Sequence, residues 1–396
     1  MNESNFFSIR FAARALTLCV LLYCFFLGLD LLGMAFRLFG EGFAEALITQ
    51  TSNPFVGLLI GILATSLMQS SSSTTSIVVG LVAAEALTVT GAIPIIMGAN
   101  IGTSVTATLV SLGHVGRPEE FRRAFAGATV HDFFNWMAVL VLLPLEIATG
   151  YLEKSSTRLE ALFAGVGGTK LLNPVKAIVR PVAEWVTEML GQSGAITLVV
   201  GLLLLFLALK FLVDFLRTVF SGRAEQILHR TLFRSAFAAI LAGTALTVMV
   251  QSSSITTSTM IPLIGAGVIT LEQLFPFTIG ANLGTTVTAI LAALHAGVPA
   301  GIVVAFSHLL FNVTASVLLY GIPWVRRIPL AMSRRMGDLA VRSRFLAGGF
   351  VAFMFYVLPL LALVLSGAFA SAENDSPEDS SAPVVIESEV EAGASG

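Results

Sequence analysis

Seven apolar segments of this chain are each long enough to cross a lipid bilayer as a helix, which takes about 20 residues. Hydrophobic residues make up 56% of the chain and charged residues 12%, about half the charged share of a soluble domain. We therefore predict an all-α polytopic membrane protein, and we exclude a soluble domain, a disordered chain and a nucleic-acid binder. The seven segments are Ala15–Phe39, Ala92–Leu112, Ala124–Ala148, Ala195–Phe220, Leu274–Leu294, Gly301–Ile322 and Phe345–Ala370.

Two further apolar windows, Pro54–Ala86 and Ser235–Val268, are each interrupted by a run of hydroxyl residues. Polar backbone at membrane depth must be buried in protein or line a cavity. We therefore predict that each window is a re-entrant helical hairpin whose tip lies inside the membrane.

The positive charges predict how the chain is oriented. Four basic groups, which hold 15 of the 22 Lys and Arg residues, fall on one side of this threading, and such an excess marks the cytoplasmic side. The N-terminus is then cytoplasmic, and the tail 371–396, with seven acidic residues and no Lys or Arg, is external and disordered. The groups are Arg10/Arg14, Arg117/Arg122/Arg123, Arg217/Arg223/Arg230/Arg234 and Arg326/Arg327/Arg334/Arg335/Arg342/Arg344.

An internal duplication organises the sequence. Gln69–Ser76 matches Gln251–Ser258, and Gly98–Thr106 matches Gly280–Thr288, both at an offset of 182 residues. Over 47 aligned positions, 21 are identical without a gap, which indicates a duplicated unit. His131…Asn135 and His308…Asn312 form a third pair, at an offset of 177.

The duplication divides the chain into parts. In the threading above, the two hairpins open from opposite sides, so the repeats have inverted topology, as in secondary transporters. The predicted parts are an N-terminal span (1–40), the first repeat (41–150), an external loop (151–194), the second repeat (195–322), a basic cytoplasmic loop (323–344), the last span (345–370) and the acidic tail (371–396).

The duplicated motifs contain no Lys or Arg. Gln and Ser side chains both donate and accept hydrogen bonds, and a helix that restarts after a hairpin tip presents free N–H groups to an anion. The Asn-x-Gly-Thr sequences should interrupt Ala92–Leu112 and Leu274–Leu294 and free carbonyl groups for Na⁺. The other interpretation is close helix packing, because Gly98-x-x-x-Gly102 and Gly280-x-x-x-Gly284 are small-xxx-small motifs.

Asp132 is the ionisable residue within a span that lies nearest the duplicated motifs, and such residues mark functional sites. Its counterpart in the second repeat is Leu309, so the fold of the repeat does not need the acid, and we favour cation binding over a structural ion pair. His131 and His308 are expected to be hydrogen-bonded core residues. The two cysteines, Cys19 and Cys24, suggest neither a disulfide-stapled loop nor a metal site.

At these motifs the sequence resembles the type II sodium–phosphate cotransporter family, including its bacterial members. The resemblance rests on both Gln-Ser-Ser-Ser runs, on Pro94–Thr103 and on Phe121–Trp136. It implies phosphate binding by Gln69, Ser70, Ser71, Ser72, Gln251, Ser252, Ser253, Ser254 and Thr103. It implies sodium binding by Asn100, Thr106, Asp132, Asn135, Asn282, Thr285 and Thr288, with Asp132 matching the acid that accompanies an extra, charge-carrying sodium ion.

The leading hypothesis is a sodium-coupled symporter that imports inorganic phosphate by alternating access, with Na⁺ as coupling ion and no other cofactor. It would lie in a bacterial inner membrane. A sodium-coupled carrier of another oxyanion, such as sulfate or a dicarboxylate, is the alternative. An intramembrane hydrolase is disfavoured because neither G-x-S-x-G nor H-E-x-x-H occurs. A channel fits two occluding hairpins poorly, and oligomeric state is left open.

Overall fold

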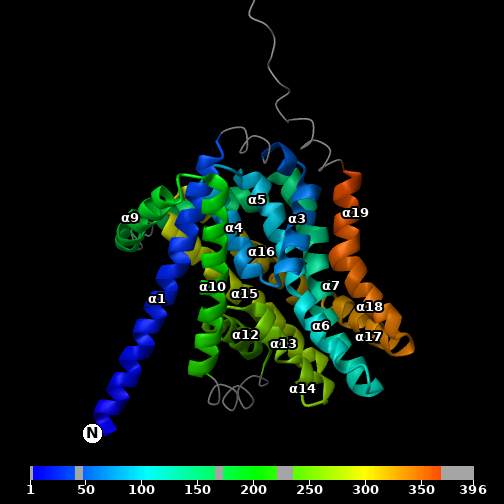
Figure 1. The fold of residues 1–396 in the computed structure, drawn as a ribbon. Helices are drawn as coiled ribbons and strands as arrows, with labels where there is room; N and C mark the ends of the chain where they lie inside the picture. Colours follow the sequence, from blue (N-terminus) through cyan, green and yellow to red (C-terminus); the bar gives the residue numbers. More distant parts are fainter. Residues whose placement is uncertain (1–2, 41–47, 166–172, 221–234, 367–396) are drawn as a thin grey trace, which may run out of the picture.

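The computed structural model describes residues 3–40, 48–165, 173–220 and 235–366, which form helices and turns and no strand (Figure 1). The helices of the first half are α1 (Glu3–Leu38), α3 (Pro54–Met68), α4 (Ser71–Ala83), α5 (Val89–Thr103), α6 (Val105–Leu112), α7 (Pro118–Thr149), α8 (Tyr151–Gly165) and α9 (Asn173–Met189). Those of the second half are α10 (Gly194–Phe220), α12 (Ala236–Val250), α13 (Ser253–Ser258), α14 (Ile261–Gly265), α15 (Leu271–Ala296), α16 (Pro299–Ala315), the π-helix η2 (Ser316–Tyr320), α17 (Arg327–Arg342), α18 (Arg344–Ala352), the π-helix η3 (Phe353–Val357) and α19 (Leu358–Leu365).

Seven helical segments of this described part are long and apolar enough to cross a membrane. They coincide with the seven predicted windows, so the prediction of an all-α polytopic membrane protein is confirmed. The segments are Ala12–Leu38, Val89–Leu112, Pro118–Thr149, Gly194–Phe211, Leu271–Ala296, Pro299–Tyr320 and Arg344–Leu365.

Each of the two interrupted windows folds as a helix, a tight turn and a returning helix. The arms α3, α4 and α12 have 15, 13 and 15 residues, so at 1.5 Å per residue they are roughly 20–22 Å long. They are therefore shorter than the ~30 Å hydrocarbon core. The returning arm of the second hairpin divides into α13 and α14, because Pro262 lies in the first turn of α14 and cannot continue a helix.

Glycines bring the outgoing arm of each hairpin unusually close to the following long helix. A Cβ atom on Gly98 would lie 2.0 Å from the carbonyl oxygen of Leu58, and one on Gly280 would lie 2.0 Å from that of Ile240. These contacts, between α3 and α5 and between α12 and α15, are related by the offset of 182 residues. The duplicated glycines therefore pack helices, and the duplication extends from sequence to tertiary contacts.

Gly98→Ala is expected to destabilise the protein by about 1–3 kcal/mol, because no alanine fits at that backbone contact without moving α3 away from α5. Thermal unfolding of the purified protein in detergent measures the effect. The control is Gly33→Ala in α1, where an added Cβ meets no atom within 4 Å. Equal melting temperatures for the two variants would contradict the role of the contact.

The prediction that Leu274–Leu294 is interrupted is wrong, because α15 is continuous over this segment. Two features keep it helical. Gly280 admits the neighbouring helix α12 instead of letting the backbone unwind, and the Thr285 hydroxyl donates to the carbonyl of Ala281, at 3.1 Å, within the same helix. In the first repeat the interruption is slight: α5 ends at Thr103, α6 begins at Val105, and Ser104 between them keeps right-handed helical dihedrals.

The two hairpins enter the molecule from opposite ends. Figure 1 shows α3 and α4 joined to the rest of the chain at the upper end, and α12 and α14 at the lower end. Each hairpin also packs against a helix of the other repeat, since α4 contacts α15 and α13 contacts α6. The two tips are thereby held at the interface between the repeats.

The start of α7 and the N-terminus of α1 lie at the lower end (Figure 1), and α17, which carries several arginines, packs against α7. Arg122 pairs with Asp338 at 3.6 Å, and Arg334 pairs with Glu272. The predicted external loop contains α8 and α9, and α9 lies toward the opposite, upper end (Figure 1). Glu146 of α7 accepts hydrogen bonds from the N–H groups of Leu152 and Glu153, which caps α8. Arg223, Arg230, Arg234 and the predicted acidic tail lie outside the described residues.

Candidate functional site

The tips of the two hairpins touch each other. The hydroxyl oxygens of Ser71 and Ser253, which are equivalent positions 182 residues apart, lie 3.4 Å from each other. Ser72 donates to the backbone carbonyl of Gln251, also at 3.4 Å. Ser254 donates to the carbonyl of Thr103, at 3.4 Å, and so connects the second tip to the end of α5. Six of the nine predicted phosphate-binding residues are therefore joined by contacts between the repeats.

Both tips have the same backbone geometry. Gln69 and Gln251 adopt left-handed helical dihedrals, with φ of 51° and 54°. Non-glycine residues adopt such dihedrals rarely and at a cost, and strain of this kind gathers at functional sites. The next residue in each repeat caps the returning helix: the Ser70 hydroxyl accepts from the N–H of Ser73, and the Ser252 hydroxyl accepts from that of Ile255. The other first-turn N–H groups have no acceptor within the helix.

The side chains of the two glutamines differ in their contacts. The Gln251 amide donates to the carbonyl of Val248 at 2.7 Å, and its oxygen accepts from the Thr288 hydroxyl at 2.6 Å. Gln69 is exposed. The hydroxyl of Thr106, the counterpart of Thr288, is buried and has no hydrogen-bond partner within the described chain. The two halves of the site are thus equivalent in sequence and backbone but not in side-chain pairing.

A chain of buried amides links three helices beside the tips. The Asn135 amide of α7 donates to the carbonyl of Asn100 in α5 at 2.7 Å, and Asn282 of α15 donates to the Asn135 side-chain oxygen at 2.8 Å. The Asn282 side-chain oxygen lies 2.8 Å from Nε2 of His131. Three of the predicted sodium ligands are therefore brought together, and His131 is a hydrogen-bonded core residue as predicted.

Asp132 is fully buried on α7. One carboxyl oxygen accepts from the Thr108 hydroxyl of α6 at 3.3 Å, and the other finds no partner among the residues described. A buried carboxylate with one free oxygen is costly unless a proton or a cation neutralises it. The second carboxyl oxygen of Asp132 is therefore available as a ligand for a sodium ion.

The three threonines among the remaining predicted ligands have different hydrogen-bond partners. Thr103 donates from its hydroxyl to Ala99 within α5, and its carbonyl faces the second tip. Thr285 bonds only within α15 in the described contacts, and the bond of Thr288 goes to Gln251. Sequence reasoning missed the link between His131 and Asn282, although the repeated His131…Asn135 and His308…Asn312 pairs were the signal for it.

The cluster at the tips can hold an anion without a basic side chain. It combines hydroxyl and amide donors with two helix N-termini, whose partial positive charge attracts anions. The neighbouring amide and carboxyl oxygens are the hard ligands that alkali cations prefer. Together they suit an anion and cations bound side by side.

Comparison with known proteins finds a family model and relatives that cover most of the chain. The family model described as Na⁺/Pi-cotransporter matches residues 24–167 and 203–322. Sodium-dependent phosphate transport protein 2B of Homo sapiens is 35% identical over 450 residues, which cover 89% of this chain and 65% of that protein. Sodium-dependent phosphate transport protein 2A of Rattus norvegicus is 35% identical over 425 residues, covering 88% of this chain and 67% of that protein.

The chain thus spans about two-thirds of the length of these relatives. No solved structure matches it. The family match covers both repeats, including both hairpin tips, the amide chain and Asp132. The chain therefore belongs to the Na⁺/Pi-cotransporter family.

Proposed function

We propose that the protein is a sodium-coupled symporter that imports inorganic phosphate by alternating access. The observation that carries the proposal is the meeting of the two duplicated tips at Ser71 and Ser253, 3.4 Å apart. Two hairpins that enter from opposite ends and share one site provide a gate on each side of it. The names of the relatives supply the substrate and the coupling ion.

Phosphate is held by Gln69–Ser72, Gln251–Ser254 and Thr103, and sodium by the amide chain, Asp132 and the neighbouring threonines. Because no Lys or Arg is among these residues, the cations that balance the charge of phosphate are the sodium ions themselves. Phosphate is then bound well only when sodium is bound, which couples the two fluxes. Na⁺ is the coupling ion, and no other cofactor is required.

The repeats have inverted topology in a bacterial inner membrane, with the basic end in the cytoplasm. The N-terminus is then cytoplasmic and the α8–α9 end is external. The protein acts as a transporter, and the serines at its tips hydrogen-bond with one another and with carbonyl groups.

The experiment is uptake of radiolabelled phosphate into proteoliposomes containing the purified protein. An inward sodium gradient should drive uptake, and an equal potassium gradient should not. Excess unlabelled phosphate should compete, whereas sulfate and succinate should not. Uptake that is indifferent to sodium would overturn the coupling, and stronger competition by sulfate or succinate would make another oxyanion the substrate.

A further inference from the structure

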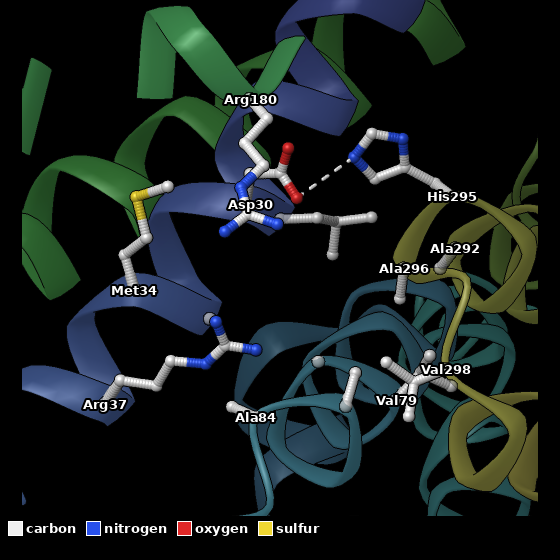
Figure 2. Close-up of a pocket in the computed structure, with 14 residues that line it drawn as sticks. Asp30, Met34, Arg37, Val79, Ala84, Arg180, Ala292, His295, Ala296 and Val298 are labelled. Atoms are coloured by element: carbon white, nitrogen blue, oxygen red, sulfur yellow. Dashed lines mark ion pairs between the residues drawn. The ribbon is translucent and has the colours of Figure 1, made fainter. Parts of the chain in front are cut away.

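A cavity lies away from the hairpin tips, between α1, α4, α9 and α15 (Figure 2). Its wall on α4 is formed by Val79, Gly80 and Ala83, at the end of that helix opposite Ser70. At 1.5 Å per residue, the nine residues from Ser70 to Val79 place the nearest part of this wall roughly 14 Å from the tip. The cavity is therefore separate from the proposed transport site.

Two arginines from different helices line this cavity. Arg37 lies in the last turn of α1, and Arg180 lies on α9. Figure 2 shows both side chains pointing into the same space. Arg180 also pairs with Glu184 at 2.9 Å. Neither guanidinium forms an ion pair with Asp30 of the same cavity within the described part of the chain.

Asp30 and His295 form the polar back wall. Nε2 of the fully buried His295 lies 3.3 Å from one carboxyl oxygen of Asp30, and the His295 ring stacks on Phe26 with a centroid distance of 4.4 Å. The second Asp30 oxygen is buried and has no hydrogen-bond partner in the residues described, and nor does Nδ1 of His295. The Asp30 side chain as a whole is 14% exposed and lines the cavity, so it places a carboxylate acceptor beside two cationic donors.

The cavity has the volume of a small anion. It measures about 70 Å³, and one water molecule needs roughly 10–15 Å³ of such space. It therefore accommodates a group of about five non-hydrogen atoms, the number in a phosphate group.

Its position corresponds to the edge of a membrane. Arg37 is one residue from the end of the apolar span Ala12–Leu38. Helix α9 is docked on α1 through Thr187, whose hydroxyl donates to the sulfur of Met34 at 3.4 Å. The exposed Trp185 of α9 is a residue type enriched at membrane–water interfaces. Both water-borne anions and lipid headgroups are available at that level.

We propose that this cavity is a second binding site for a phosphate group, held by Arg37 and Arg180, on a ligand that also offers a hydrogen-bond donor to Asp30. Guanidinium groups match phosphate geometry, and a carboxylate rejects an anion that has no proton to donate. Monohydrogen phosphate and the headgroup of an ethanolamine phospholipid meet both requirements. Sulfate and the phosphodiester of phosphatidylcholine have no such donor.

The test uses the full-length protein with Gln69→Ala and Gln251→Ala, so that binding at the hairpin tips does not contribute. Calorimetric titration with inorganic phosphate or sulfate probes the free anions. Native mass spectrometry with dioleoyl phosphatidylethanolamine or dioleoyl phosphatidylcholine probes the lipids. Adding Arg37→Gln and Arg180→Gln should weaken binding of the preferred ligand at least tenfold. The control Arg158→Gln alters an exposed cation on α8, outside the cavity, and should change nothing.

Binding of phosphate alone identifies the free anion as the ligand, and binding of phosphatidylethanolamine alone identifies the lipid. A second variant, Asp30→Asn, should admit sulfate, because the amide no longer repels an anion without a proton. If neither probe binds, or if the arginine variant binds as tightly as its parent while melting at the same temperature, the proposal is wrong. Should the arginine variant fail to fold, the change of selectivity in Asp30→Asn decides.

Discussion

Replacing Gln251 with alanine is expected to slow sodium-driven phosphate uptake by roughly 10- to 100-fold, while the protein still inserts in the membrane. The amide of Gln251 bonds to Val248 and Thr288 at the meeting point of the tips. A buried polar group that loses its hydrogen-bond partner costs about 1–3 kcal/mol. Because about 1.4 kcal/mol corresponds to a tenfold change in a binding constant, this loss is expected to slow uptake by the stated factor. Initial uptake rates in proteoliposomes, normalised to incorporated protein, measure the effect.

The left-handed backbone conformation of Gln251 makes a second variant necessary as a control for strain in the alanine variant. Its φ of 54° lies in the left-handed region, where alanine is strained and glycine is not. Gln251→Gly therefore removes the amide without adding backbone strain, and it should lose transport as severely as Gln251→Ala. Wild-type rates for the glycine variant would assign the residue to the turn and reject it as a ligand. Gln69→Ala and Gln69→Gly apply the same test to the first tip.

Uptake is expected to carry net positive charge inward, and Asp132→Asn is expected to make it electroneutral and less dependent on sodium. Divalent phosphate with two sodium ions is neutral, so a third sodium adds one charge per cycle. Asp132 is fully buried with one unpaired oxygen, which a sodium ion would satisfy. A potential of 100 mV adds about 2.3 kcal/mol per charge, or roughly 50-fold in phosphate accumulation.

The measurement compares phosphate uptake at one fixed sodium gradient with and without an inside-negative potential set by valinomycin. The wild type should respond to the potential, and Asp132→Asn should not. Glu146→Gln is the control, because this second buried carboxyl on α7 is already occupied by the N–H groups of Leu152 and Glu153. A wild type indifferent to the potential would refute the role of Asp132 and leave phosphate symport standing.

The duplicated sequence predicted two equivalent hairpin tips, at Gln69 and at Gln251, and the resemblance implied phosphate binding by both. Identical residues at equivalent positions can meet across a shared interface, and Ser71 and Ser253 do so. The same glycines supported two interpretations, unwinding and close packing. Packing proved right at Gly280, where the carbonyl of Ile240 fills the space beside the backbone, because spacing alone does not reveal how near the neighbouring helix approaches.

Other features could not be predicted because they depend on which conformation the chain adopts. The first repeat has Gln69 and Thr106 where the second has Gln251 and Thr288. In the structure described, Gln251 and Thr288 hydrogen-bond to each other, whereas the Thr106 hydroxyl has no partner. Because the two copies of the motif have the same residues, the sequence cannot indicate which of them forms the hydrogen bond between Gln and Thr. Asp30, Arg37 and Arg180 lie outside the repeated motifs, and their common cavity arises from the docking of α9 on α1.

Equilibrium binding of radiolabelled phosphate to the purified protein, in sodium and in potassium buffer, tests most directly whether the two tips form one sodium-dependent phosphate site. The difference between the two buffers is the sodium-dependent component. It should be present in the wild type and in Gly348→Ala, where an added Cβ on α18 meets no atom within 4 Å. It should disappear in both Gln69→Gly and Gln251→Gly. Equal binding in the two buffers, or a sodium-dependent component that survives in both glutamine variants, would contradict the account.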